Sequence, residues 1–193
     1  IFFISIVFFF QTSLLAYSSN PEEFIKELVN EAISKLSDKN LNEEEKSNFI
    51  EKIAIDNVDI KALSLYTLGE LRKSAEKQTL IKYQEAFEKY FLKSLTSRLT
   101  DYSSSKFKII GADKKSSNYT IVSSKVSPDD GGPEIKIDWR VYTKNSDKPL
   151  IRDLIVEGLS LARTQKEEFA SILNSNNNDI NILISKLREF VNN

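Results

Sequence analysis

Apolar residues recur every three or four positions through the first half of the chain, and this spacing predicts amphipathic helices. The first stripe runs from Phe24 to Leu36. It follows Asn20, a residue type that caps helices, and Pro21, which suits the first helical position. We therefore expect a helix that begins near Pro21 and buries one face.

Three further helices are expected before the character of the sequence changes. Asn42 and Asp59 are placed to cap the first two of them. The third is the longest, spans 75–102 and carries a stripe of large apolar residues that includes Phe87 and Phe91. Such a stripe indicates a buried face, which is usually core and is equally compatible with the wall of a cavity.

From about position 106 the pattern becomes an alternation of apolar and polar residues, which predicts strands. The clearest run is IKIDWRVY at 135–142. Turn-forming residues gather at 128–133 and again at 145–149. Four strands within 106–158, joined by short turns, imply an antiparallel meander whose apolar face the helices must cover.

The segment PLIRDLIVEGLSLARTQKEEF, residues 149–169, combines a strand, a corner and a helix. Asp153 and Glu157 are expected on one face of the strand, opposite its apolar residues. Gly158 lets the backbone bend at the corner, and Ser160 is placed to cap the helix that follows.

These periodicities divide the chain into a helical first half at 20–102, a sheet at 106–158 and C-terminal helices at 160–191. Asp179 is placed to cap the last helix, whose apolar stripe should pack on the first helical unit. Residues 19–193 are enough to bury a core and are expected to form a single domain.

The N-terminal segment is almost entirely apolar up to Leu15, and small residues follow at Ala16 and Ser18. A run of this length is short for a bilayer span, which needs about 20 residues. The pattern predicts a signal peptide at 1–18, cleaved near Ser18, and therefore an exported protein. A retained membrane anchor is the alternative.

The amino-acid composition excludes several kinds of functional site. The chain has no cysteine and no histidine, which excludes disulfides, thiolate chemistry, histidine bases and Cys/His zinc sites. Its formal net charge of −1 gives no basic surplus for nucleic acid. We expect no metal, no cofactor and no nucleic-acid partner.

Two blocks of the sequence resemble MlaC-type proteins, the periplasmic phospholipid-binding proteins of the toluene-tolerance family. The first block is LYTLG at 65–69, followed by Gln78 and a helix from Phe87 to Leu99. The second is a strand with the pattern D-x-x-x-E-G-x-S and a later phenylalanine, matched here by Asp153, Glu157, Gly158, Ser160 and Phe169. The resemblance covers roughly Pro21 to the C-terminus.

The resemblance implies an α+β fold: a twisted antiparallel four-stranded sheet that forms a cone-like roll, is covered by several helices and leaves an apolar cavity between them. It also implies a periplasmic carrier that holds the acyl chains of a phospholipid. Its partners would be an inner-membrane MCE-domain protein of an ABC transporter and an outer-membrane lipoprotein complex. Transport direction and head group stay open, as does a hopanoid-type cargo.

Ten apolar residues at inward positions are candidates for lipid contact, and ordinary core packing is the alternative for each of them. Trp139 and Tyr142 are alternatively placed at the mouth of the cavity, with their polar edges toward water. The ten candidates are Leu63, Leu68, Phe87, Phe91, Ile121, Ile137, Trp139, Val141, Leu154 and Val156.

Two other functions compete with lipid carriage. Asp153 and Glu157 could serve an enzyme as paired carboxylates, with Asp56, Arg152 or Arg163 as a partner in space. Four positions along a strand place them about 13 Å apart, which exceeds the roughly 5–9.5 Å of paired-carboxylate hydrolases. We therefore expect a structural corner that supports the cavity wall and no catalysis. The other competitor is an adaptor that binds proteins without lipid cargo.

Overall fold

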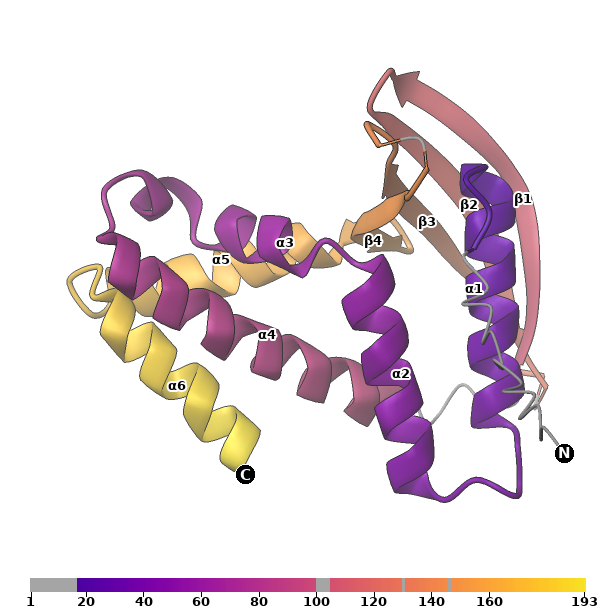
Figure 1. Cartoon of the computed structure of the whole chain (residues 1–193), viewed down its shortest axis with the longest axis horizontal. Helices are drawn as coiled ribbons and strands as arrows, with labels where there is room; N and C mark the ends of the chain where they lie inside the picture. Colours follow the sequence, from indigo (N-terminus) through magenta and orange to yellow (C-terminus); the bar gives the residue numbers. More distant parts are fainter. Residues whose placement is uncertain (1–16, 100–104, 130, 146) are drawn as a thin grey trace, which may run out of the picture.

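The computed structural model describes four stretches of the chain: residues 17–99, 105–129, 131–145 and 147–193 (Figure 1). The expected signal peptide lies almost wholly outside these residues, and so does the expected end of the longest helix at Tyr102. Among the described residues, no helix is both long enough and apolar enough to cross a bilayer.

The described stretches form six α-helices, one short 3-10 helix and an open sheet of five strands. The helices are α1 (Pro21–Leu36), α2 (Glu43–Asn57), α3 (Ile60–Thr67), η1 (Gly69–Lys73), α4 (Lys77–Leu99), α5 (Leu161–Asn174) and α6 (Ile180–Asn192). The strands are β1 (Ser105–Ser116), β2 (Tyr119–Pro128), β3 (Ile135–Tyr142), β4 (Leu150–Val156) and β5 (Leu159–Ser160).

The helix caps that the sequence predicted are confirmed for α1, α2, α3 and α6. The Asn20 side chain accepts hydrogen bonds from the first turn of α1, and Asp59 and Asp179 do the same for α3 and α6. Asn42 and Glu45 form a capping box, in which each side chain accepts from the backbone N–H of the other. The longest helix, α4, begins at Lys77, two residues later than expected.

The sheet is an antiparallel meander in the order β1-β2-β3-β4-β5, so the prediction of four strands was one too few. The additional strand, β5, has two residues and pairs with the end of β4. A strand this short carries no periodicity, which is why the alternation of the sequence did not reveal it. β3 and β4 also shift register between Arg140 and Val141, where Arg152 is the extra residue on β4.

The two faces of the sheet have different neighbours. Helix α1 packs on one face, here called the inner face, and runs along the concave side of the bent sheet (Figure 1). Phe24 and Ile25 of α1 are buried there against Val122, Trp139 and Val141 of the sheet, and we call this cluster the sheet core. The opposite, outer face is turned toward α3 and the start of α5.

Trp139 is not at a cavity mouth, contrary to one of the expectations. Its side chain is buried in the sheet core, and its indole Nε1–H donates to the Ser124 hydroxyl at 2.8 Å. A buried indole needs such an internal acceptor because no water reaches it.

A second cluster, here called the helical core, joins the remaining helices. Phe87 of α4, Phe169 of α5 and Leu183 of α6 are buried in it. Helix α6 packs on α4 and α5, which confirms the expected position of the last helix on the first helical unit. Val58, between α2 and α3, packs against both cores.

Candidate functional site

The strand-to-helix corner after β4 is held by its carboxylates. Asp153 is 4 % exposed, and its carboxylate accepts hydrogen bonds from the Ser160 hydroxyl at 2.6 Å and from the Ala162 backbone N–H at 3.0 Å. Ser160 in turn caps α5 by accepting from the Arg163 N–H at 3.1 Å. The buried acid therefore fixes the first turn of the helix that follows its own strand.

Glu157 has a different position from the one that the sequence suggested. It lies beyond the end of β4, in the two-residue turn that joins β4 to β5, and not on the strand face beside Asp153. Glu157 and Gly158 both have positive φ, 49° and 83°, the signature of a type I′ hairpin turn. The Glu157 carboxylate accepts from the Lys136 backbone N–H. Asp153 and Glu157 therefore accept hydrogen bonds from different backbone N–H groups, those of Ala162 and Lys136.

The partner of Asp153 is also different from those considered. Arg140 on β3 approaches it, with Nη1 at 3.6 Å from Oδ2. The register shift turns Arg152, one of the expected partners, to the outer face, and there it pairs with Asp59 at 2.7 Å. Asp56 pairs with Lys52 on the surface of α2.

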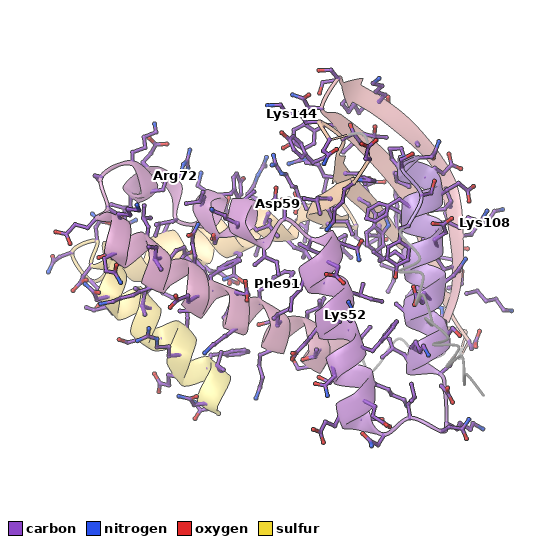
Figure 2. The ribbon with its side chains drawn as sticks, in the orientation of Figure 1. Lys52, Asp59, Arg72, Phe91, Lys108 and Lys144 are labelled. Carbon is purple, nitrogen blue, oxygen red and sulfur yellow. The ribbon has the colours of Figure 1, made fainter. Side chains whose placement is uncertain are left out.

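Arg152 is the centre of a network between the sheet and the joint of α2 and α3. Its Nη1 donates to the Tyr119 hydroxyl and its Nε to the Asp59 carboxylate, both at 2.8 Å. Partial burial acts to lower the pKa of Arg152, but the hydrogen bonds to Tyr119 and Asp59 outweigh it, so the pKa is raised. Figure 2 shows Asp59 at the joint that this network holds.

A groove of about 990 Å³ opens on the outer face, and we call it the outer groove. One wall is largely apolar and comes from α3, with Leu63, Leu65 and Tyr66. The opposite wall is the outer face of the sheet, where Ile121 and Ile155 alternate with charged groups. Four cations line the groove: Arg72, Lys115, Arg140 and Arg152. Arg72 lies on η1 (Figure 2).

The ten lipid-contact candidates divide among three places. Leu63 and Ile121 line the outer groove. Leu68 and Phe87 are buried in the helical core, and Phe91 is half-buried against it. The remaining five share the inner face of the sheet: Ile137, Trp139, Val141, Leu154 and Val156.

The inner face places neighbouring candidates opposite one another across β3 and β4. Trp139 stands opposite Leu154, and Ile137 stands opposite Val156. Trp139 is buried, whereas Ile137, Leu154 and Val156 are only half-buried. Helix α1 contacts β1 and β2 most extensively and reaches Trp139 and Val141 on β3. The β3–β4 end of the inner face therefore keeps apolar surface that the chain's own packing covers incompletely.

The charged lining of the outer groove was not anticipated as a site. Arg140 belongs to the alternating run at 135–142, which predicted a strand and no site, and Arg72 carries no motif. Alternation does place Arg140 and Ile121 on one face, but only the position of α3 opposite that face makes a groove of them. The part of the structure that is described contains no group of three acids placed to hold a metal ion.

Comparison with known proteins points to one family. A family model described as MlaC protein matches residues 26–189 of this chain. The fold is similar to the structure of the phospholipid-binding protein from Ralstonia solanacearum in complex with a phospholipid. That similarity has a TM-score of 0.73 at 17 % identity and covers 88 % of this chain and 96 % of that chain. A search of curated proteins gave no match. Since the family model spans most of the sequence, the chain belongs to the MlaC family.

Proposed function

We propose that the protein is a periplasmic phospholipid carrier, which binds lipid by its acyl chains and catalyses no reaction. Membership of the MlaC family supports this proposal. The fold supports it as well, because a protein of the same architecture has been solved in complex with a phospholipid. Phospholipid would be the cargo, and no cofactor is needed.

The incompletely covered apolar surface carries the proposal. Phe91 on α4 and Ile137, Leu154 and Val156 on the inner face are large apolar side chains that stay half-buried. Phe91 packs against the helical core, and Ile137 and Leu154 pack against the sheet core, with Val156 opposite Ile137. Val58 connects the two cores. In the proposal, the acyl chains lie between these cores, in an apolar cavity of a cone-like roll formed by the sheet and helices, and the head group stays in water.

The energetics favour this place over the outer groove. Each methylene removed from water contributes about 0.8 kcal/mol, so two long chains gain on the order of 20 kcal/mol in an apolar slot. The sheet wall of the outer groove carries Asp138, Arg140 and Arg152. Desolvating these charged groups under two acyl chains would offset much of that gain.

The proposed cycle places the protein between two membranes. The exported chain, with its signal peptide removed near Ser18, would exchange phospholipid with an outer-membrane lipoprotein complex and with the MCE-domain subunit of an inner-membrane ABC transporter. An apolar slot with little head-group chemistry suits such exchange, because every 1.4 kcal/mol of excess affinity over a membrane shifts the equilibrium about tenfold.

An enzyme that uses Asp153 and Glu157 is the weaker candidate. Asp153 is buried with its oxygens occupied by Ser160 and Ala162, and Glu157 accepts from the Lys136 backbone. A general acid or base needs to reach a substrate proton directly or through one water. Neither carboxylate faces a shared substrate position.

The test is to identify what the purified protein carries and whether the inner face holds it. Native mass spectrometry of the full chain should detect bound phospholipid. Val156→Trp should abolish the bound lipid and the transfer of labelled phospholipid between vesicles, because the larger ring fills the half-buried surface. Ile110→Trp is the matched control, since Ile110 is 52 % exposed on β1. A preparation that is reproducibly free of lipid, or a Val156→Trp variant that still transfers it, would refute the proposal.

A further inference from the structure

The outer groove is a second amphipathic site, on the opposite side of the sheet from the proposed acyl-chain cavity. Its α3 wall presents Leu63, Leu65 and Tyr66, and Ala162 of α5 continues the apolar surface. The facing wall is mixed, because Arg140 and Arg152 stand beside Ile121 on the outer face. A ligand in this groove meets apolar groups on one side and cations on the other.

Two of the cations keep donors free for a ligand. The Arg72 Nη1 donates to the Gly69 carbonyl at 2.8 Å, and within the described stretches no carboxylate lies within ion-pair distance of its guanidinium. Arg140 has one distant ion pair, 3.6 Å to Asp153, and its side chain is 44 % exposed. Asp153 also accepts from the Ser160 hydroxyl and the Ala162 N–H, so the guanidinium of Arg140 is not its sole hydrogen-bond partner.

The other charged side chains that line the groove already have partners within the protein. Lys115 pairs with Asp113, and Asp138 accepts from the Ser123 hydroxyl at 2.6 Å and pairs with Lys136 at 3.1 Å. Arg152 is held by Asp59 and Tyr119. Among the described residues that line the groove, the cation without an ion pair is therefore Arg72, and Arg140, whose pair with Asp153 is long and whose side chain is 44 % exposed, is the second available donor.

We propose that the outer groove binds an amphiphile with one acyl chain and an anionic head, whose carboxylate or phosphate contacts Arg72 and Arg140. Guanidinium groups suit both anions because their planar forks match the spacing of the oxygens. The chain lies along α3. A second chain would have to lie against the charged sheet wall, so the groove selects single-chain lipids. Fatty acids and lysophospholipids share this chemistry.

The test measures the binding of soluble probes below their micelle concentrations by isothermal titration calorimetry. Oleate has a single chain with a carboxylate head, and lysophosphatidylglycerol has a single chain with an anionic phosphate head. Zwitterionic lysophosphatidylcholine has a similar chain and a head without net charge, so it measures the contribution of the chain alone. At least one anionic probe should bind about tenfold or more tightly than lysophosphatidylcholine. Equal affinities for all three probes would overturn the proposal.

Substitutions test whether the two arginines hold the head. Arg72→Gln/Arg140→Gln should weaken the anionic probe at least tenfold, and Arg188→Gln on the exposed surface of α6 should leave it unchanged. Thermal melting checks that each variant is folded. Arg72→Gln alone, which breaks no ion pair, should weaken binding several-fold even if the double variant is unstable. Unchanged affinity in a folded Arg72→Gln variant would overturn the assignment.

The two lipid sites are distinguishable. Val156→Trp alters the inner face, so it should remove copurified phospholipid and leave the anionic probe bound in the outer groove. The arginine variants should show the reverse. If Val156→Trp abolishes probe binding, the probe occupies the inner cavity and the groove assignment fails, while phospholipid carriage stands. If no phospholipid copurifies but the probe binding depends on Arg72, the groove assignment stands alone.

Discussion

The guanidinium carbon of Arg152 lies 3.5 Å from the centre of the Tyr142 ring. The same guanidinium donates to the Tyr119 hydroxyl and to the Asp59 carboxylate. Asp59 caps α3, and its backbone N–H donates to the Ile151 carbonyl of β4 at 2.9 Å. The Arg152 side chain therefore connects the joint of α2 and α3 to the sheet. The sheet core and the helical core meet at this joint.

Arg152→Ala should lower the free energy of unfolding by about 2 kcal/mol, because it removes a cation–π contact and leaves a half-buried carboxylate without its partner. The side chains of Arg152 and Asp59 are only 26 % and 18 % exposed, so solvent screens this pair incompletely. Urea unfolding followed by circular dichroism measures the change. Lys52→Ala is the control, since its ion pair with Asp56 is largely exposed and should contribute less than about 0.5 kcal/mol. Equal losses in the two variants would contradict the role given to Arg152.

The turn between β4 and β5 depends on backbone conformation more than on space. Gly158 has φ +83°, and a Cβ built at this position meets no atom within 4 Å. Gly158→Ala should destabilise the protein by about 1–2 kcal/mol, the cost of a left-handed conformation for an L-residue. Gly111→Ala provides a matched control, because Gly111 also has open space around its Cβ position and has no positive φ. Chemical unfolding of both variants should give a loss in the first and almost none in the second.

The buried carboxylate of Asp153 should matter for stability and not for chemistry. Asp153→Asn keeps the shape but replaces one acceptor oxygen by a donor, which then faces the Ser160 hydroxyl or the Ala162 N–H. We expect a loss of about 1–3 kcal/mol, because a buried group is left without its hydrogen bond. Asp129→Asn, at an exposed position, is the control. Retention of bound phospholipid in the folded Asp153→Asn variant would agree with a structural corner, and loss of lipid without loss of stability would not.

Local patterns predicted the elements of this fold well. Asn20, Asn42, Asp59, Ser160 and Asp179 each cap the helix that they were expected to start, because a cap needs only a short polar side chain and the residues next to it. Alternation also separated the two faces of the sheet. Such signals lie within a few residues of one another, so the sequence contains them completely.

The contacts between elements were less accessible to sequence reasoning. The register shift opposite Arg152 turns that residue to the outer face, and no local signal marks it. Arg140 stands directly opposite Asp153 in the register of β3 and β4, and it took the place beside Asp153 that Arg152 was expected to share. The burial of Trp139 depends on the Ser124 hydroxyl, fifteen residues away on the neighbouring strand. Such pairings follow from strand register and helix placement, which periodicity alone leaves undetermined.

The buried phenol of Tyr83 should make the protein sensitive to alkali. Its side chain is 0 % exposed, and burial raises its pKa from the ordinary value of 10.0. Below pH 10.0 the phenol is neutral in both the folded and the unfolded chain. Above pH 10.0 the Tyr83 phenol loses its proton in the unfolded chain before it does so in the folded chain. Ionisation of Tyr83 should therefore reduce the free energy of unfolding by up to about 1.4 kcal/mol per pH unit, until the phenol ionises in the folded chain as well.

Tyr83→Phe separates this effect from other titrations at high pH. The Thr67 hydroxyl donates to the Ser64 carbonyl at 2.9 Å, so the Tyr83 hydroxyl is the donor in its 2.8 Å contact with Thr67. Removing it should cost about 1 kcal/mol at pH 7. Between pH 10 and 11, the urea midpoint of Tyr83→Phe should fall less steeply than that of the unmodified protein, because one titrating group is gone. Tyr66→Phe, which alters a side chain 39 % exposed, should keep the original slope. Parallel slopes in all three proteins would mean that Tyr83 ionises as readily in the folded chain as in the unfolded one, and that its burial does not contribute to alkaline unfolding.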